Sequence, residues 1–226
     1  MWRYGKAATT MGVLFLAAAC GGHGAGTVPS TSHPLTGAAA DHSRMVDMRV
    51  RLDDLGPNWR QVEPRPHQPA TCEPDPKNVS ITAGSWTNRG VAFMYGSRAS
   101  IESDALVFAT PKDAETALAA FMQRSNIRCL EREMKAEFKP RHGLRLLGLT
   151  DRLLARRGVG DAFDGYRVTM NLARGKRIYQ IYADVLVMRQ DRAIAAFTYA
   201  NAYEPAPETA ELSIAQALAN RGALAE

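Results

Sequence analysis

The stretch that decides the fold is GYRVTMNLARGKRIYQIYADVLVMRQDRAIAAFTYA, residues 165–200. In residues 165–172 and again in residues 178–189, apolar and polar side chains alternate with a period of two, which is typical of half-buried strands. The short turns ARGK and QD separate these segments from each other and from residues 193–200. Strands joined by such short turns run antiparallel, so the sequence predicts a three-strand meander.

Further elements lie on both sides of the meander. Residues 91–95 and 101–108 are expected to form a hairpin, and residues 144–154 a further strand. Thr110 is a typical helix N-cap and Pro111 fits the first turn, so a helix should follow them. Sequential hairpins give an antiparallel sheet. We therefore predict an α+β fold in which helices pack against a twisted antiparallel sheet in a single domain.

Two shorter elements complete this prediction. Residues 51–59 should form a helical turn that stops at a Gly-Pro pair, with Leu52, Leu55 and Trp59 holding it to the core. A last helix should begin after Pro207 and present one apolar side to the sheet.

The N-terminus predicts export and a lipid anchor. Arg3 and Lys6 precede an apolar run over residues 7–19, and small residues stand directly before Cys20. This pattern is typical of a bacterial lipoprotein signal, in which the cysteine becomes the lipidated N-terminus. An ordinary cleaved signal and an uncleaved membrane helix are the alternatives. We expect residues 1–19 to be the signal, 20–43 a lipidated cysteine with a flexible tether, and 44–226 the folded α+β domain on the extracytoplasmic face of the cell membrane.

The cysteine count fits export, because a lipid on Cys20 leaves Cys72 and Cys129 as a single pair in an oxidising compartment. A disulfide between them closes a loop of 57 residue steps, and in the chain-entropy model that is worth about 4 kcal/mol. Cys129 lies eleven residues past Leu118 and should share its core-facing side of the helix. Two unrelated buried thiols and a metal pair are the alternatives.

Charge and motifs argue against several classes of function. The formal charge of +5 falls to +3 when Arg3 and Lys6 are removed, which is too little for a nucleic-acid binder. The sequence has no nucleophile elbow, zinc-protease motif or phosphate-binding loop. The Asp53-Asp54 pair has adjacent side chains that point apart, so it is not an acid/base dyad. We therefore expect a non-catalytic protein with no cofactor and no metal.

Aromatic residues on the expected sheet are the first candidates for binding. Amphipathic rings on a concave face suit a small molecule, a lipid or a glycan. We expect Tyr182 to stack on a ligand together with Trp86 and Tyr95, while Arg167 on the neighbouring strand pairs with an acidic group of that ligand. The alternative is that most of the aromatic residues belong to the core.

A basic segment is the second candidate. Residues 131–157 contain eight Lys and Arg against four Asp and Glu, a net charge of +4. Such a segment can attract anionic headgroups or envelope polymers, although a solvated surface is the default explanation. An interaction or scaffold protein that docks an anionic envelope partner is therefore the alternative to a ligand-binding module, and a hydrolase is a third.

Several motifs, in their order along the chain, resemble those of a known family. They are DLGPNW at residues 54–59, a cysteine in the next proline-rich loop, VFATPKDA at residues 107–114, Cys129 and the later Gly160-Asp161 pair. In this order the chain resembles actinobacterial lipoproteins related to the extracellular sensor domain of mycobacterial serine/threonine kinase H. The resemblance covers roughly residues 49–221. It implies an antiparallel sheet flanked by helices, a ligand-binding cleft and disulfide bracing, although this chain has one possible disulfide where that domain has two.

Overall fold

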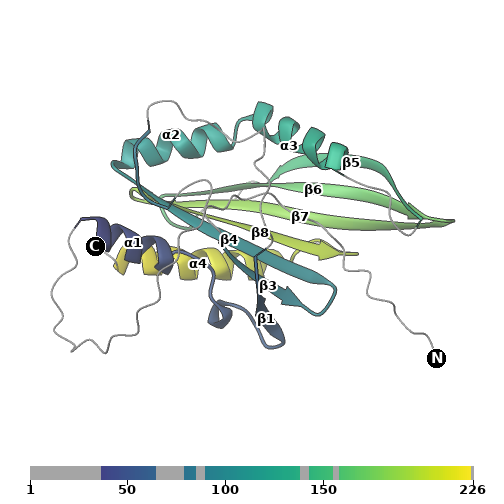
Figure 1. Cartoon of the computed structure of the whole chain (residues 1–226), viewed down its shortest axis with the longest axis horizontal. Helices are drawn as coiled ribbons and strands as arrows, with labels where there is room; N and C mark the ends of the chain where they lie inside the picture. The colour runs from purple at the N-terminus through teal and green to yellow at the C-terminus, as the bar shows by residue number, and fades with distance from the viewer. Residues whose placement is uncertain (1–36, 65–78, 85–89, 138–142, 155–157, 225–226) are drawn as a thin grey trace.

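The computed structural model describes residues 37–64, 79–84, 90–137, 143–154 and 158–224. Within these residues, eight antiparallel strands form one sheet, and helices pack on both of its faces (Figure 1). The α+β fold predicted from the meander is confirmed. Cys20, Cys72 and Trp86 lie outside the described residues, as do the expected signal segment and residues 20–36 of the expected tether.

The sheet has the strand order β1-β3-β4-β8-β7-β6-β5, and β2 pairs with the end of β4 that β3 does not reach. The three central hairpin strands are those predicted from residues 165–200, extended by a few residues. The strands are β1 (Trp59–Val62), β2 (Ile81–Ala83), β3 (Val91–Tyr95), β4 (Ala99–Phe108), β5 (Leu144–Leu154), β6 (Ala162–Arg174), β7 (Arg177–Gln190) and β8 (Ala193–Ala202).

Two pairs of helices cover the two faces of the sheet (Figure 1). The helices are α1 (Ala38–Asp47), α2 (Pro111–Phe121), α3 (Arg124–Glu137) and α4 (Glu208–Leu224), with a 3-10 turn η1 (Leu52–Asp54) after α1. On the α1/α4 face, Leu186 and Met188 of β7 are buried in one core with Leu218 of α4. On the α2/α3 face, the intervening Val187 is buried with Leu118 of α2. This part of β7 is therefore buried on both sides.

Helix α1 begins at Ala38, inside the segment expected to be a tether. Ion pairs from distant residues hold it to the turn between β7 and β8. Arg192 donates to the Asp41 carboxylate, and Arg44 donates to Asp191 at 3.2 Å. Residues 38–43 are thus helical, and the folded domain starts earlier than the composition indicated.

The turn after α1 differs from its prediction at one residue. Leu55 and Trp59 pack against the main core as expected, but Leu52 is 44% exposed, so its predicted core contact is wrong. Arg221 of α4 fixes the turn instead, because its guanidinium donates two hydrogen bonds of 2.7 Å to the Asp54 carboxylate. An ion pair thus replaces one of the expected apolar contacts.

The helix predicted after Thr110 is present and capped as expected, since the Thr110 hydroxyl accepts a hydrogen bond of 3.1 Å from the Asp113 amide. The helix ends at Phe121, however, and α3 starts at Arg124. A helical wheel continued from α2 therefore does not predict which side chains of α3 face the core. Cys129 is half-buried, and Ile127 is the fully buried residue nearest to it on α3.

Candidate functional site

Helix α4 covers only part of its sheet face. On β7, Leu186 and Met188 are completely buried beneath α4, whereas Tyr182 on the same face is half-buried and Gln180 is exposed. Figure 1 shows α4 under one half of the sheet and the ends of β6 and β7 extending past it. We call the uncovered half the open face, defined by Tyr95, Asn171, Gln180, Tyr182 and Thr169.

One row of paired residues crosses the open face. Its members, in strand order from β3 to β5, are Tyr95, Ala99, Asn201, Tyr182, Thr169 and Thr150. Adjacent strands lie about 4.8 Å apart, so three strand spacings put Tyr95 and Tyr182 about 14 Å from each other. The short side chains of Ala99 and Asn201 lie between the two rings. Ala99 and Asn201 are themselves buried, so the parts of the row that reach the surface are at Tyr95 and from Tyr182 onward.

Trp59 completes the aromatic end of this row. Its ring centroid is 5.7 Å from that of Tyr95 and 5.8 Å from that of Tyr199, the latter in an edge-on arrangement. Tyr95 is 39% exposed, so this cluster reaches the surface. The sequence pattern predicts Trp59 in the core and Trp86 at the site. The stacking partner that the structure gives to Tyr95 is Trp59, which β1 brings opposite it.

A chain of polar side chains extends from Tyr182 along β7 and onto β6. The Tyr182 hydroxyl donates to Gln180 Oε1 at 2.6 Å, and Gln180 Nε2 donates to Asn171 Oδ1 at 2.9 Å. All three residues lie on the same face of β6 and β7, as the alternation of the strands predicted. Hydroxyl and amide groups of this kind can bind hydroxyls or amides of a ligand without requiring it to be charged.

A buried ion pair lies next to Tyr182 on the same face of the sheet. Arg167 on β6 donates to Asp184 on β7 through Nε and Nη2, both at 2.5 Å, and the Asp184 side chain is completely buried. These hydrogen bonds raise the pKa of the guanidinium. The Arg167 Cζ atom is also 6.0 Å from the Tyr182 ring centroid. Arg167 and Tyr182 therefore lie together on one face, as predicted, but the guanidinium is committed to Asp184 rather than offered to an acidic ligand.

A second carboxylate approaches this pair from α4. Glu211 in the first turn of the helix is completely buried, and its charge further raises the pKa of Arg167. Burial raises the pKa of the Tyr199 hydroxyl, and Glu211 adds to that effect. The Arg167 guanidinium thus interacts with two carboxylates, those of Asp184 and Glu211, at the boundary between the covered half and the open face. Sequence analysis did not find Glu211, because only the packing of α4 brings it there.

The basic segment of residues 131–157 does not form one surface. Arg132 and Lys135 are exposed on α3, whereas Arg145 and Arg152 pair with β6 residues on the opposite face of the sheet. The other basic residues of the segment lie outside the described residues. In the described part of the chain, no three His, Cys, Asp or Glu side chains come together in a way that could hold a metal ion.

Comparison with known proteins identifies no relative of this chain. No family model matches it, and no curated protein or solved structure does either. None of the described helices is both long and apolar enough to cross a membrane.

Proposed function

We propose that this protein is a lipid-anchored, non-catalytic ligand-binding or sensor-like module on the extracytoplasmic face of a bacterial cell membrane. The observation that supports binding is the open face, where the helix layer stops and leaves an aromatic cluster and a chain of polar groups uncovered on one side of the sheet. The resemblance to sensor-domain lipoproteins and the signal pattern before Cys20 support the anchoring and the location.

The chemistry of the open face favours an uncharged polar ligand. The charges that border it are already neutralised internally, since Arg167 pairs with Asp184 next to Tyr182. The groups that remain at the surface are the hydroxyl of Tyr182, the amides of Gln180 and Asn171, and the ring of Tyr95. Rings and amides together suit a glycan or another small molecule rich in hydroxyls, which stacks on the ring and exchanges hydrogen bonds with the amides.

The chain offers a matched pair of residues for testing this proposal. Gln180 and Gln216 are both exposed, and each donates a 2.9 Å hydrogen bond to a neighbouring asparagine, but only Gln180 is on the open face. The full chain is purified from native membranes, and the small molecules that copurify with it are identified by mass spectrometry. Wild type and Gln216→Ala should retain the same compound, whereas Gln180→Ala and Tyr182→Ala should lose most of it. Equal retention by all four proteins, or no compound with wild type, contradicts the proposal.

A further inference from the structure

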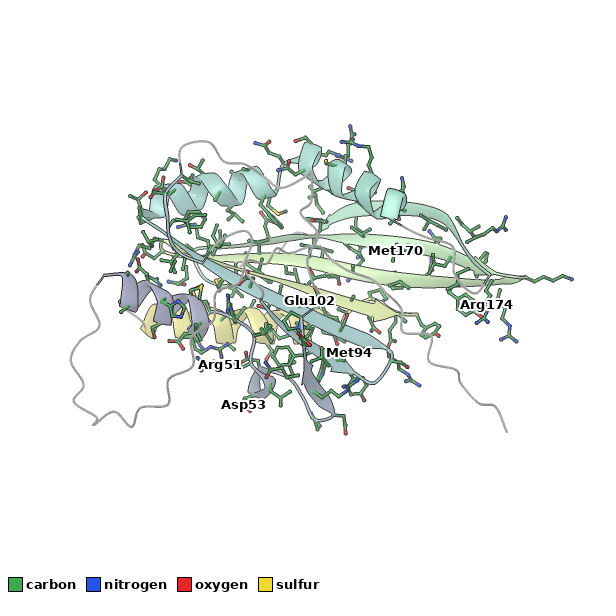
Figure 2. All side chains as sticks on the ribbon, viewed as in Figure 1. Arg51, Asp53, Met94, Glu102, Met170 and Arg174 are labelled. Atoms are coloured by element: carbon green, nitrogen blue, oxygen red, sulfur yellow. The ribbon has the colours of Figure 1, made fainter. Side chains whose placement is uncertain are left out.

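The hairpin that joins β6 to β7 ends in a cluster of positive charge. Arg174 and Arg177 pair across the turn, Lys176 lies in the turn, and Arg145 on β5 pairs with the residue before Arg174. All four side chains are exposed. Figure 2 places Arg174 at the far end of the sheet, beyond the helices. We call this end of the sheet the basic tip.

The positive charges of the basic tip have few acidic partners within the described protein. None of the salt bridges among the described residues involves one of the four basic residues. Elsewhere in the described structure, arginines are paired repeatedly, as Arg167, Arg192 and Arg221 show. Like charges held close together repel one another, and an anionic surface relieves that repulsion.

One exposed apolar and one exposed aromatic side chain lie near this end of the hairpin. Ile178 follows Arg177 directly, and Tyr203 lies beside the same strand because its amide donates to the Gln180 carbonyl at 2.9 Å. Both side chains are 68% exposed, the highest values among the large apolar residues of the described structure. The Tyr203 ring also contacts Tyr179 edge-on, with centroids 6.4 Å apart.

The backbone conformation at Tyr203 is a second observation that points to a binding surface at the tip. Its φ angle is +82°, a left-handed conformation that a tyrosine rarely adopts. Strained backbone of this kind persists where the surrounding structure holds it, and it is common at binding sites. Here this backbone conformation holds the Tyr203 ring largely in solvent, near the basic residues. In that position the ring gains little from packing against the rest of the protein.

We propose that the basic tip docks onto an anionic lipid bilayer. Arginine and lysine side chains bind phosphate groups of lipid headgroups, while tyrosine and isoleucine side chains enter the interfacial layer beside them. A soluble polyanion would match the charge alone, but it would not bury Ile178 and Tyr203. The combination of both residue types in one exposed hairpin end therefore favours the bilayer. This inference is independent of the open face and of any ligand bound there.

The test measures binding of the full chain to lipid vesicles, with Cys20→Ala in every protein so that no lipid is attached. Vesicles of phosphatidylcholine alone are compared with vesicles that also contain phosphatidylglycerol. The triple variant Arg174→Ala, Lys176→Ala and Arg177→Ala removes three charges from the tip. Its matched control, Arg124→Ala, Arg128→Ala and Lys135→Ala, removes three exposed charges from α3. The apolar run at residues 7–19 is the same in all variants, so its contribution cancels in the comparison.

Each basic residue near an anionic surface contributes about a factor of five to binding, so the tip variant should bind the anionic vesicles roughly 100-fold more weakly. The α3 control should stay close to the parent protein. A second pair tests the apolar part: Ile178→Ser with Tyr203→Ser should weaken binding, whereas Val46→Ser with Leu52→Ser, also exposed, should not. Equal losses in both charge variants overturn the proposal. So does a loss confined to the charge variant, because Ile178 and Tyr203 then do not enter the bilayer.

Discussion

Arg167 and Asp184 stand opposite each other on β6 and β7, and two parallel hydrogen bonds of 2.5 Å join the guanidinium to the carboxylate. The pair lies where the cover of α4 ends, between the buried Leu186 and the half-buried Tyr182. Because the two residues can meet in only one pairing of the strands, the ion pair favours the observed register over a slipped one. It also borders the open face on the side of α4.

Removing one member of this pair should destabilise the fold strongly. Asp184→Ala leaves the Arg167 guanidinium buried without its partner, and the loss of such a partner costs about 3–5 kcal/mol of unfolding free energy. Urea denaturation measures this loss. Replacing both residues together, with Arg167→Met and Asp184→Leu, should recover part of it, because neither charge of the pair then remains buried, although the buried Glu211 loses the nearby guanidinium.

The exposed pair of Lys112 and Glu115 provides the control, since Glu115→Ala removes a carboxylate that is in solvent. Its unfolding transition should stay close to that of wild type. A loss for Asp184→Ala as small as that for Glu115→Ala would show that the buried pair does not hold the strands.

The Asp41 carboxylate should make the stability of the protein sensitive to acid. Hydrogen bonds from Arg192 hold the pKa of this carboxyl below its ordinary value of 3.8. The stabilisation is complete above that value, because the carboxylate is then charged in both the folded and the unfolded chain. It declines as the pH falls below 3.8, where the unfolded chain takes up the proton first, and it is lost once the pH has passed the lowered pKa.

Asp41→Asn removes this contribution. The difference in unfolding free energy between wild type and Asp41→Asn should be constant between about pH 5 and pH 7 and should shrink below about pH 4. Urea denaturation over this range measures it. Asp53→Asn, which changes an exposed carboxylate on η1, should show no such trend. A difference that is independent of pH down to the acid limit would mean that the Asp41–Arg192 pair contributes nothing.

The local part of this structure could be predicted from the sequence, and the part that depends on register could not. Alternation along residues 165–200 identified β6, β7 and β8 because burial repeats every second residue in a strand. It also placed Tyr182 and Arg167 on one face. Nothing in the sequence showed that Arg167 would meet Asp184, because that contact depends on how the two strands are aligned.

Long-range packing explains the other differences. Trp59 lies beside Tyr95 because β1 pairs with β3, although the intervening chain carries no signal for that pairing. The start of α1 at Ala38 depends on the contact between Asp41 and Arg192, which are 151 residues apart. Composition alone assigned residues 38–43 to the tether, because small residues suit both a helix and a flexible segment.

A disulfide between Cys72 and Cys129 remains a prediction, since Cys72 lies outside the described residues. Peptide mapping by mass spectrometry without reductant should recover the two cysteines in one cross-linked peptide, with their Cα atoms within about 7 Å in a crystal structure. Cys72→Ala and Cys129→Ala should each lower the unfolding free energy, by up to about 4 kcal/mol in the chain-entropy model. Alkylation of both thiols in the native, unreduced protein would rule the bond out.

Lipidation of Cys20 is the prediction on which the proposed location depends. The intact mass of the protein from native membranes should correspond to a chain that begins at Cys20 and carries a diacylglyceryl adduct. Cys20→Ala should lack the adduct and leave the membrane, whereas Cys129→Ala should stay bound. The release is measured after a wash at about 1 M salt, which shortens the screening length to about 3 Å and so suppresses any attraction between the basic tip and anionic lipids. A mature chain that begins at another residue, or that has no adduct, contradicts the lipoprotein assignment even if the protein is found in the membrane fraction.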